Sequence, residues 1–294
     1  MKIAKILGTA ALVSTLGAQA YAAPAAKDVL TTYADIAHAG YEDSLITAKE
    51  LQATIDELVA NPSAATFDAA KSAWLASRVP YQQTEVYRFG NAIVDDWEGK
   101  VNAWPLDEGL IDYVETGLYG EESEENPAYT ANVIANPTLT ISGETIDAST
   151  IDTALLESLH EIDDVEPNVA TGYHAIEFLL WGQDLNGTDA GAGERKWTDY
   201  AAGDACTNGN CDRRGEYLQA AADLMVSDLE WMTAQWAEGG EARETVLEGD
   251  GVPGLTAIVT GMGSLSYGEL GGERTKLGLL LHDPEEEHDC FSDN

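Results

Sequence analysis

Apolar residues recur at the spacing of an α-helix along most of this chain, and this pattern restricts the fold more than any other feature. Between Asp28 and Val59 they fall every three or four positions, and the turn Asn61-Pro62-Ser63 ends the run. Pro80 lies inside a second such segment and is expected to kink or split that helix. The sequence therefore predicts an all-α protein, with further helices at about 64–93, 151–160, 172–181, 213–236 and 252–281.

Two segments depart from a regular helix. Residues 120–150 lack the helical period and are predicted to form a surface insertion, with a small β-hairpin around Ser142-Gly143 or an irregular structure. The segment 252–281 keeps the period but contains several glycines, among them Gly261, Gly263, Gly268, Gly271 and Gly272, each of which weakens a helix by roughly 1 kcal/mol relative to alanine. We therefore expect the backbones of neighbouring helices to approach closely there.

The N-terminus has the layout of a secretory signal. Lys2 and Lys5 precede the apolar stretch Ile6–Leu16, and Ala20-Tyr21-Ala22 provides a small-x-small cleavage site. We predict a signal peptide at 1–22, a mature domain at 23–294, and export to the periplasm. The apolar stretch is shorter than the roughly 20 residues that span a bilayer, so no transmembrane segment is expected. The first cysteine is Cys206, so no lipid attachment site follows the signal.

The chain is strongly acidic. It carries 52 Asp and Glu residues against 15 Lys and Arg, for a formal net charge of −37. This charge opposes binding to nucleic acid or to anionic lipid, and we expect no nucleic-acid partner. An acidic, solvated surface explains the charge without a specific site.

Two of the three cysteines flank a short Gly/Asn turn. In an oxidising compartment, Cys206 and Cys211 are predicted to form a small disulfide loop. A zinc site is the alternative, but no His or third Cys lies nearby in the sequence. Cys290 is left without a predicted partner.

His174 and Glu177 are the main candidates for a functional site. They lie one helical turn apart in the otherwise apolar run 172–182, so both face the same side of a helix. A buried ionised glutamate costs several kcal/mol without a partner, so the pair either binds a cation or forms a buried hydrogen-bonded pair. The metallopeptidase motif H-E-x-x-H is absent, and H-x-x-E-H fails because Phe178 replaces the second histidine. A peptidase activity therefore stays uncertain, with Glu177 as its candidate catalytic group.

Other polar residues gather at helical spacing. A stripe on the second helix is flanked by aromatic residues, so it either faces protein as part of a site or forms an internal salt-bridged face: Arg78, Tyr81, Glu85 and Arg88. Asp107 begins an acidic first helical turn and is interpreted as a cap. The acidic segment 283–294 is interpreted as a solvated loop, although His282 and His288 are possible metal ligands.

Several of these segments together resemble the imelysin family, also called the insulin-cleaving membrane protease family, and most of all its iron-regulated bacterial members. The resemblance extends from the second helix to the last residue. It is carried by Thr84-Glu85 with Arg88-Phe89, by Asn102-x-Trp104-Pro105-Leu106-Asp107-Glu108, by Gly172-x-His174-x-x-Glu177, by Gly261-Met262-Gly263-x-Leu265-Ser266, and by Glu287-His288-x-Cys290-Phe291-Ser292-Asp293-Asn294.

The resemblance implies a fold and a set of site residues. Imelysin-like proteins are all-helical, with two halves resembling four-helix bundles, which would place the first at about 28–160 and the second from about 170 to 294. The G-x-H-x-x-E motif lies at their junction, which nominates His174 and Glu177 as the core of a metal site and Glu85 as a third acidic group. Four further residues match segments near the junction with less support: Asp107, Arg274, Ser292 and Asp293.

One departure from the family concerns the end of the chain. Imelysin-like chains continue past the Phe-Ser-Asp-Asn segment, whereas this one stops within it. We therefore expect a truncated sequence whose second half lacks helices. Apolar helix faces between Val252 and Leu281 should then be exposed.

Three functions are weighed. The first is a metal-binding protein linked to iron uptake, located in the periplasm or associated with the outer membrane. Its cofactor would be a divalent metal, iron or zinc. Its further partner would be an iron-uptake membrane component or a peptide. The alternatives are a zinc-dependent metallopeptidase of the imelysin type, and a structural or protein-binding helical bundle without metal. Carboxylates and imidazoles suit iron and zinc alike, so the ligand types do not choose the metal.

Overall fold

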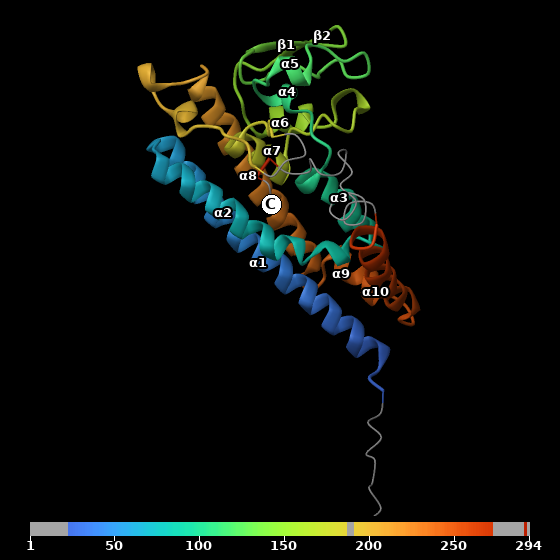
Figure 1. Cartoon of the computed structure of the whole chain (residues 1–294). Coiled ribbons are helices and arrows are strands. Elements are labelled where there is room, and N and C mark those ends of the chain that lie inside the picture. The colour runs from blue at the N-terminus through green and yellow to red at the C-terminus, as the bar shows by residue number, and fades with distance from the viewer. Residues whose placement is uncertain (1–22, 187–190, 273–290, 293–294) are drawn as a thin grey trace, which may run out of the picture.

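Long helices packed side by side form the body of the molecule (Figure 1). In the computed structural model, which describes residues 23–186, 191–272 and 291–292, the helix α1 (Ala26–Ala60) packs against α2 (Ala64–Gln82) and α8 (Cys211–Trp236). The helix α7 (Gly172–Trp181) packs against both α2 and α8. This arrangement bears out the expectation of a mostly helical protein.

Shorter elements surround these helices. α3 (Ala92–Asn102) packs against α7 and α8, while α9 (Glu241–Leu247) and α10 (Val252–Ser264) lie together near the start of α1 (Figure 1). Short helical segments connect the main elements: α4 (Glu108–Ile111), α5 (Thr116–Tyr119), α6 (Thr153–Leu159), η1 (Glu85–Tyr87), η2 (Ile162–Asp164), η3 (Trp197–Tyr200), η4 (Gly203–Ala205) and the π-helical η5 (Leu265–Glu269).

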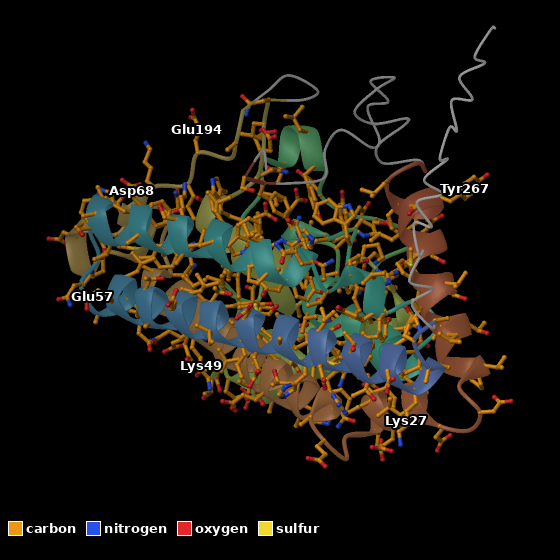
Figure 2. The ribbon with its side chains drawn as sticks, turned by 90° about the horizontal axis from the view of Figure 1, so that it is seen from below. Lys27, Lys49, Glu57, Asp68, Glu194 and Tyr267 are labelled. Atoms are coloured by element: carbon orange, nitrogen blue, oxygen red, sulfur yellow. A yellow bond between two sulfur atoms is a disulfide. The ribbon has the colours of Figure 1, made fainter. Side chains whose placement is uncertain are left out.

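The apolar periodicity of α1 and α2 explains their packing. Leu51, Ile55 and Leu58 recur on one face of α1 and are fully buried. Ser63 begins α2 with a capping box, in which its hydroxyl oxygen accepts from the backbone N–H of Thr66. Outward-facing positions are charged, as Lys49, Glu57 and Asp68 show in Figure 2. The two helices thus form an amphipathic pair with its apolar side toward α7 and α8.

The segment 64–93 is split, as the proline predicted. α2 ends at Gln82, two residues after Pro80, and the chain continues through η1 into a separate helix, α3, that begins at Ala92. Gly90 lies between them with a φ of +84°, a conformation that favours glycine. The break turns the end of the Arg78–Arg88 stripe toward α3.

The predicted hairpin is present. Strands β1 (Thr138–Ile141) and β2 (Glu144–Asp147) pair antiparallel, with Thr138 opposite Asp147. Ser142 and Gly143 form the two-residue turn with φ values of +49° and +83°, as a type I′ turn requires. Leu139 and Ile141 anchor β1 in the core.

The glycines of α10 allow close backbone contacts. A Cβ on Gly261 would lie 2.4 Å from the carbonyl oxygen of Val86, and one on Gly254 would lie 2.1 Å from that of Val246. The outer side of this segment is apolar and exposed, as Tyr267 shows in Figure 2, and the expectation of exposed apolar side chains is confirmed over 252–270 by Val252, Val259, Met262, Tyr267 and Leu270. Residues 273–281 lie outside the described part of the chain.

Among the described helices, none combines the length and the apolar character needed to cross a membrane. The predicted signal peptide at 1–22 lies outside the described residues. The division into halves at about 28–160 and 170–294 stays a prediction.

Candidate functional site

Helix α7 carries the candidate site and is enclosed on all sides. All ten of its residues are buried, between α2, α3 and α8. Gly172, the first residue of the G-x-H-x-x-E motif, has a φ of +81° and a Cβ there would lie 2.4 Å from the carbonyl oxygen of Val101. The glycine is therefore required both by its backbone conformation and by the close approach of α3.

His174 and Glu177 contact each other, as their spacing predicted. The Nδ1 atom of His174 lies 2.9 Å from Oε2 of Glu177. The side chain of Glu177 is fully buried, and that of His174 nearly so. Because a carboxylate only accepts hydrogen bonds, Nδ1 of His174 carries a proton and donates it to Glu177.

The second oxygen of Glu177 is bonded by Ser292. Both the backbone N–H and the hydroxyl of Ser292 donate to Oε1, the backbone bond measuring 3.1 Å. The neighbouring Phe291 packs against Phe178, and its carbonyl oxygen accepts from the N–H of Gly193. The structure thus places Ser292 at the site and leaves Glu177 with both oxygens bonded.

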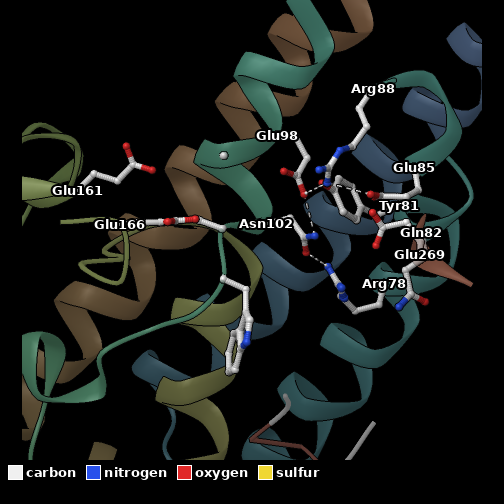
Figure 3. Close-up of a pocket in the computed structure, with 13 residues that line it drawn as sticks. Arg78, Tyr81, Gln82, Glu85, Arg88, Glu98, Asn102, Glu161, Glu166 and Glu269 are labelled. Atoms are coloured by element: carbon white, nitrogen blue, oxygen red, sulfur yellow. Dashed lines mark hydrogen bonds and ion pairs between the residues drawn. The ribbon is translucent and has the colours of Figure 1, made fainter. Parts of the chain in front are cut away.

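Trp104 contacts His174 of this pair and also lines a cavity. Its ring centroid lies 4.9 Å from that of His174 and 5.8 Å from that of Phe291. The same tryptophan lines a cavity of about 470 Å³ between α2, η1 and α3 (Figure 3). The peptide bond between Trp104 and Pro105 is cis.

The predicted polar stripe lines this cavity. Arg78, Tyr81, Glu85 and Arg88 all contribute to its wall, together with Gln82, Glu98, Gly99, Asn102, Ala103, Trp104, Glu161, Glu166 and Glu269. The stripe therefore faces a cavity, as expected for part of a site. It also contains the ion pair between Glu85 and Arg88, as expected for an internal salt-bridged face. Glu85 lines this cavity, whereas His174 is not among the described residues that line it.

Hydrogen bonds connect the polar residues on one wall of the cavity (Figure 3). Nη1 of Arg78 donates to Oδ1 of Asn102 at 2.6 Å, and Nδ2 of Asn102 donates to Glu98 at 3.0 Å. Arg88 pairs with Glu98 at 3.2 Å and with Glu85 at 3.0 Å. We call these five residues the cavity network. Burial raises the pKa of Glu85 above its usual value, although Arg88 opposes the rise.

The remaining candidates are distributed differently. Asp107 lies at the N-cap position of α4, as expected, but its side chain accepts from Asn126 at 2.6 Å and makes no capping bond. Arg274 and Asp293 lie outside the described residues, as do His282 and His288. Within the described ranges, no three or more His, Cys, Asp or Glu side chains lie together as a metal-binding group.

A buried charge cluster was missed by the sequence analysis. Asp112 pairs with Arg195 at 2.7 Å and with Arg214 at 2.6 Å, and Arg195 also pairs with Asp199 at 3.3 Å. Cys206 and Cys211 form a disulfide beside it. The one available signal was Arg214 among the buried positions of α8, but its partners lie far away in the sequence.

Comparisons with known proteins agree with this architecture. The model of the Imelysin family matches residues 37–294. Iron-regulated protein A of Synechococcus elongatus is 33% identical over 60 residues, a segment that spans 20% of this chain and only 17% of that relative. The crystal structure of a protein described as an iron-regulated protein A precursor, from Parabacteroides distasonis, has the same fold with a TM-score of 0.54 and 19% identity, over 92% of this chain and 68% of that one. This chain belongs to the Imelysin family.

Proposed function

We propose that this chain is an exported, iron-linked metal-binding protein of the imelysin type, with His174 as a metal ligand and Glu177 as the group that orients it. The contact between Nδ1 of His174 and Oε2 of Glu177, at 2.9 Å in a buried site, carries the proposal. The link to iron comes from the names of the two relatives.

The carboxylate–imidazole contact fits a metal ligand. A histidine that binds a metal commonly donates its other ring N–H to a carboxylate, which fixes the ring and makes the ligating nitrogen more basic. Because Nδ1 of His174 donates to Glu177, coordination would use Nε2. Glu177 then acts beside the ligand rather than as one, since His174 and Ser292 already bond to its two oxygens.

The donor set is suited to a divalent cation but does not identify which metal binds. Imidazole suits iron and zinc alike, and a bound ion would supply Lewis-acid or redox chemistry according to its identity. The formal charge of −37 gives the molecule a negative potential that attracts cations. Glu85, the third ligand suggested by the resemblance, lines the cavity and is not part of the proposed pair.

The peptidase alternative receives less support from this geometry. A general base must reach a water molecule, but both oxygens of Glu177 accept hydrogen bonds from protein groups and the side chain is fully buried. Phe178 occupies the position of the second histidine and packs against Phe291.

The test is a calorimetric titration of the full chain with Fe²⁺ under anaerobic conditions and with Zn²⁺. We expect His174→Ala to abolish binding and Glu177→Gln to weaken it by about 10–100-fold, as loss of such an outer partner typically does. His38→Ala is the matched control, because His38 also lies beside a glutamate on a helix but on the surface.

The same variants separate metal binding from a purely structural pair. Each variant is melted by circular dichroism without metal. Equal metal affinity of the wild type and a folded His174→Ala variant would overturn the proposal. A loss of melting temperature in that variant, with no metal binding by the wild type, would assign the pair to packing.

A further inference from the structure

Arg78 is a buried cation whose position in the cavity is unusual. Its residue is only 8% exposed, and its guanidinium lies near the rings of Trp74, Tyr81 and Tyr173, at 4.8 Å from the last. Its polar contact is a single bond to the neutral amide of Asn102. Among the residues that the structure describes, it forms no ion pair with a carboxylate.

An arginine in this state favours an anionic ligand. Burial of a charge without a counter-ion is unfavourable, and the aromatic rings compensate only part of the loss. A guanidinium presents five N–H donors in a plane, and a carboxylate accepts two of them at once. Asn102 uses one donor of Arg78, so the side chain keeps donors for a carboxylate that enters the cavity.

The rest of the wall favours positive charge. Five glutamates and two arginines line the cavity. Arg88 already pairs with Glu85 and Glu98, whereas Glu161 and Glu166 lie across the cavity from them and are exposed (Figure 3). A simple anion would be repelled by this excess of carboxylates, and a simple cation would leave Arg78 without a counter-ion.

We propose that this cavity binds a basic amino acid. Its α-carboxylate pairs with Arg78, and its ammonium groups face Glu161 and Glu166 on the opposite wall. The volume of about 470 Å³ is in the range of small-molecule pockets. This site is distinct from the proposed metal ligand, because neither His174 nor Glu177 is among the described residues that line the cavity.

L-lysine and cadaverine are the probes, since cadaverine is lysine without its carboxylate. Calorimetric titration of the metal-free full chain should give at least tenfold tighter binding of lysine. Charge alone predicts the opposite order, because cadaverine carries one more net positive charge and the cavity is acidic. Absence of heat with both probes, or equal or tighter binding of cadaverine, would overturn the proposal.

Variants assign the two ends of the ligand. Arg78→Gln should reduce the affinity for lysine to that for cadaverine, whereas Arg243→Gln should change neither, because Arg243 pairs with Asp35 away from the cavity. Glu166→Gln should weaken both probes by a similar factor, about threefold. Retained preference for lysine in a folded Arg78→Gln protein would contradict the assignment. If Arg78→Gln does not fold, the Glu166→Gln variant tests the site instead. Unchanged affinity of Glu166→Gln for both probes would contradict the proposal.

Discussion

The buried charge cluster and the cavity network contain the same types of residue but differ in how their charges are balanced. The cluster joins two arginines and two aspartates, all essentially without exposure: Asp112, Arg195, Asp199 and Arg214. In the cavity network, Arg78 forms no ion pair in the described part of the chain, while Glu85 and Glu98 share Arg88. A sealed group in which every charge is paired serves the fold, whereas an open group in which Arg78 has no ion pair within the described residues is suited to a ligand.

The loop closed by the disulfide completes the buried charge cluster. Thr207 and Asn208 both donate to Oδ1 of Asp199, at 2.6 and 2.9 Å. Arg214 donates to both oxygens of Asp112. Burial alone would raise the pKa of Asp112, but Arg195 and Arg214 together hold it below its usual value.

The largest effect is expected at the centre of the buried charge cluster. Asp112→Asn removes the counter-ion of two buried arginines, so it should lower the free energy of unfolding by about 3–5 kcal/mol in urea denaturation. Glu98→Gln in the cavity network should cost only about 1 kcal/mol, because solvent reaches the charges there. Asp35→Asn on the surface is the control. Equal losses at Asp112 and Glu98 would remove the distinction between the two groups.

A smaller loss should follow opening of the disulfide. The double substitution of Cys206 and Cys211 by serine releases a loop with a sequence separation of 5, which the loop-entropy relation values at about 2 kcal/mol. The loop also bonds to Asp199 of the cluster. The loss of unfolding free energy caused by opening the disulfide should therefore not add simply to the loss caused by Asp112→Asn. Urea denaturation of the single and combined variants measures this coupling, and simple additivity would show that the loop acts independently of the cluster.

The smallest effect is a pH dependence of opposite sign in the two groups. The pKa of Asp112 is lowered on folding, so its stabilising contribution is present above the ordinary aspartate pKa of 3.8 and is lost as the pH falls below it. The pKa of Glu85 is raised, so its ionised form opposes folding at neutral pH and this cost disappears below 4.5.

Glu85→Gln tests this difference directly. The stability of this variant relative to the wild type should be higher at pH 7 than at pH 4.5, because the wild type carries the cost of ionised Glu85 only at the higher pH. The deficit of Asp112→Asn should instead shrink as the pH falls below 3.8. Parallel slopes for the two variants in denaturation between pH 3 and pH 8 would contradict the contrast.

The sequence predicted local structure well where one physical signal dominates. The apolar period located α1, α7 and α8, and the Ser142-Gly143 turn located the hairpin. The length of the second helix was less well predicted, because the proline marks a break but the residues after it decide where the next helix begins.

Long-range charge pairing was not predictable in the same way. Asp112 and Arg214 are 102 residues apart, and only the fold brings them together. Glu85 could be placed on a polar stripe, but which residues share a cavity with it depends on how α3 packs. Asp107 has the sequence context of a cap, yet Asn126 takes its carboxylate.

The most direct test of the proposed function is anomalous diffraction from crystals of the full chain grown with Zn²⁺ or Fe²⁺. We predict a metal peak about 2.0–2.2 Å from Nε2 of His174, with Nδ1 still bonded to Glu177. A peak on an oxygen of Glu177, or a metal bound only at surface carboxylates with none at His174, would contradict the account.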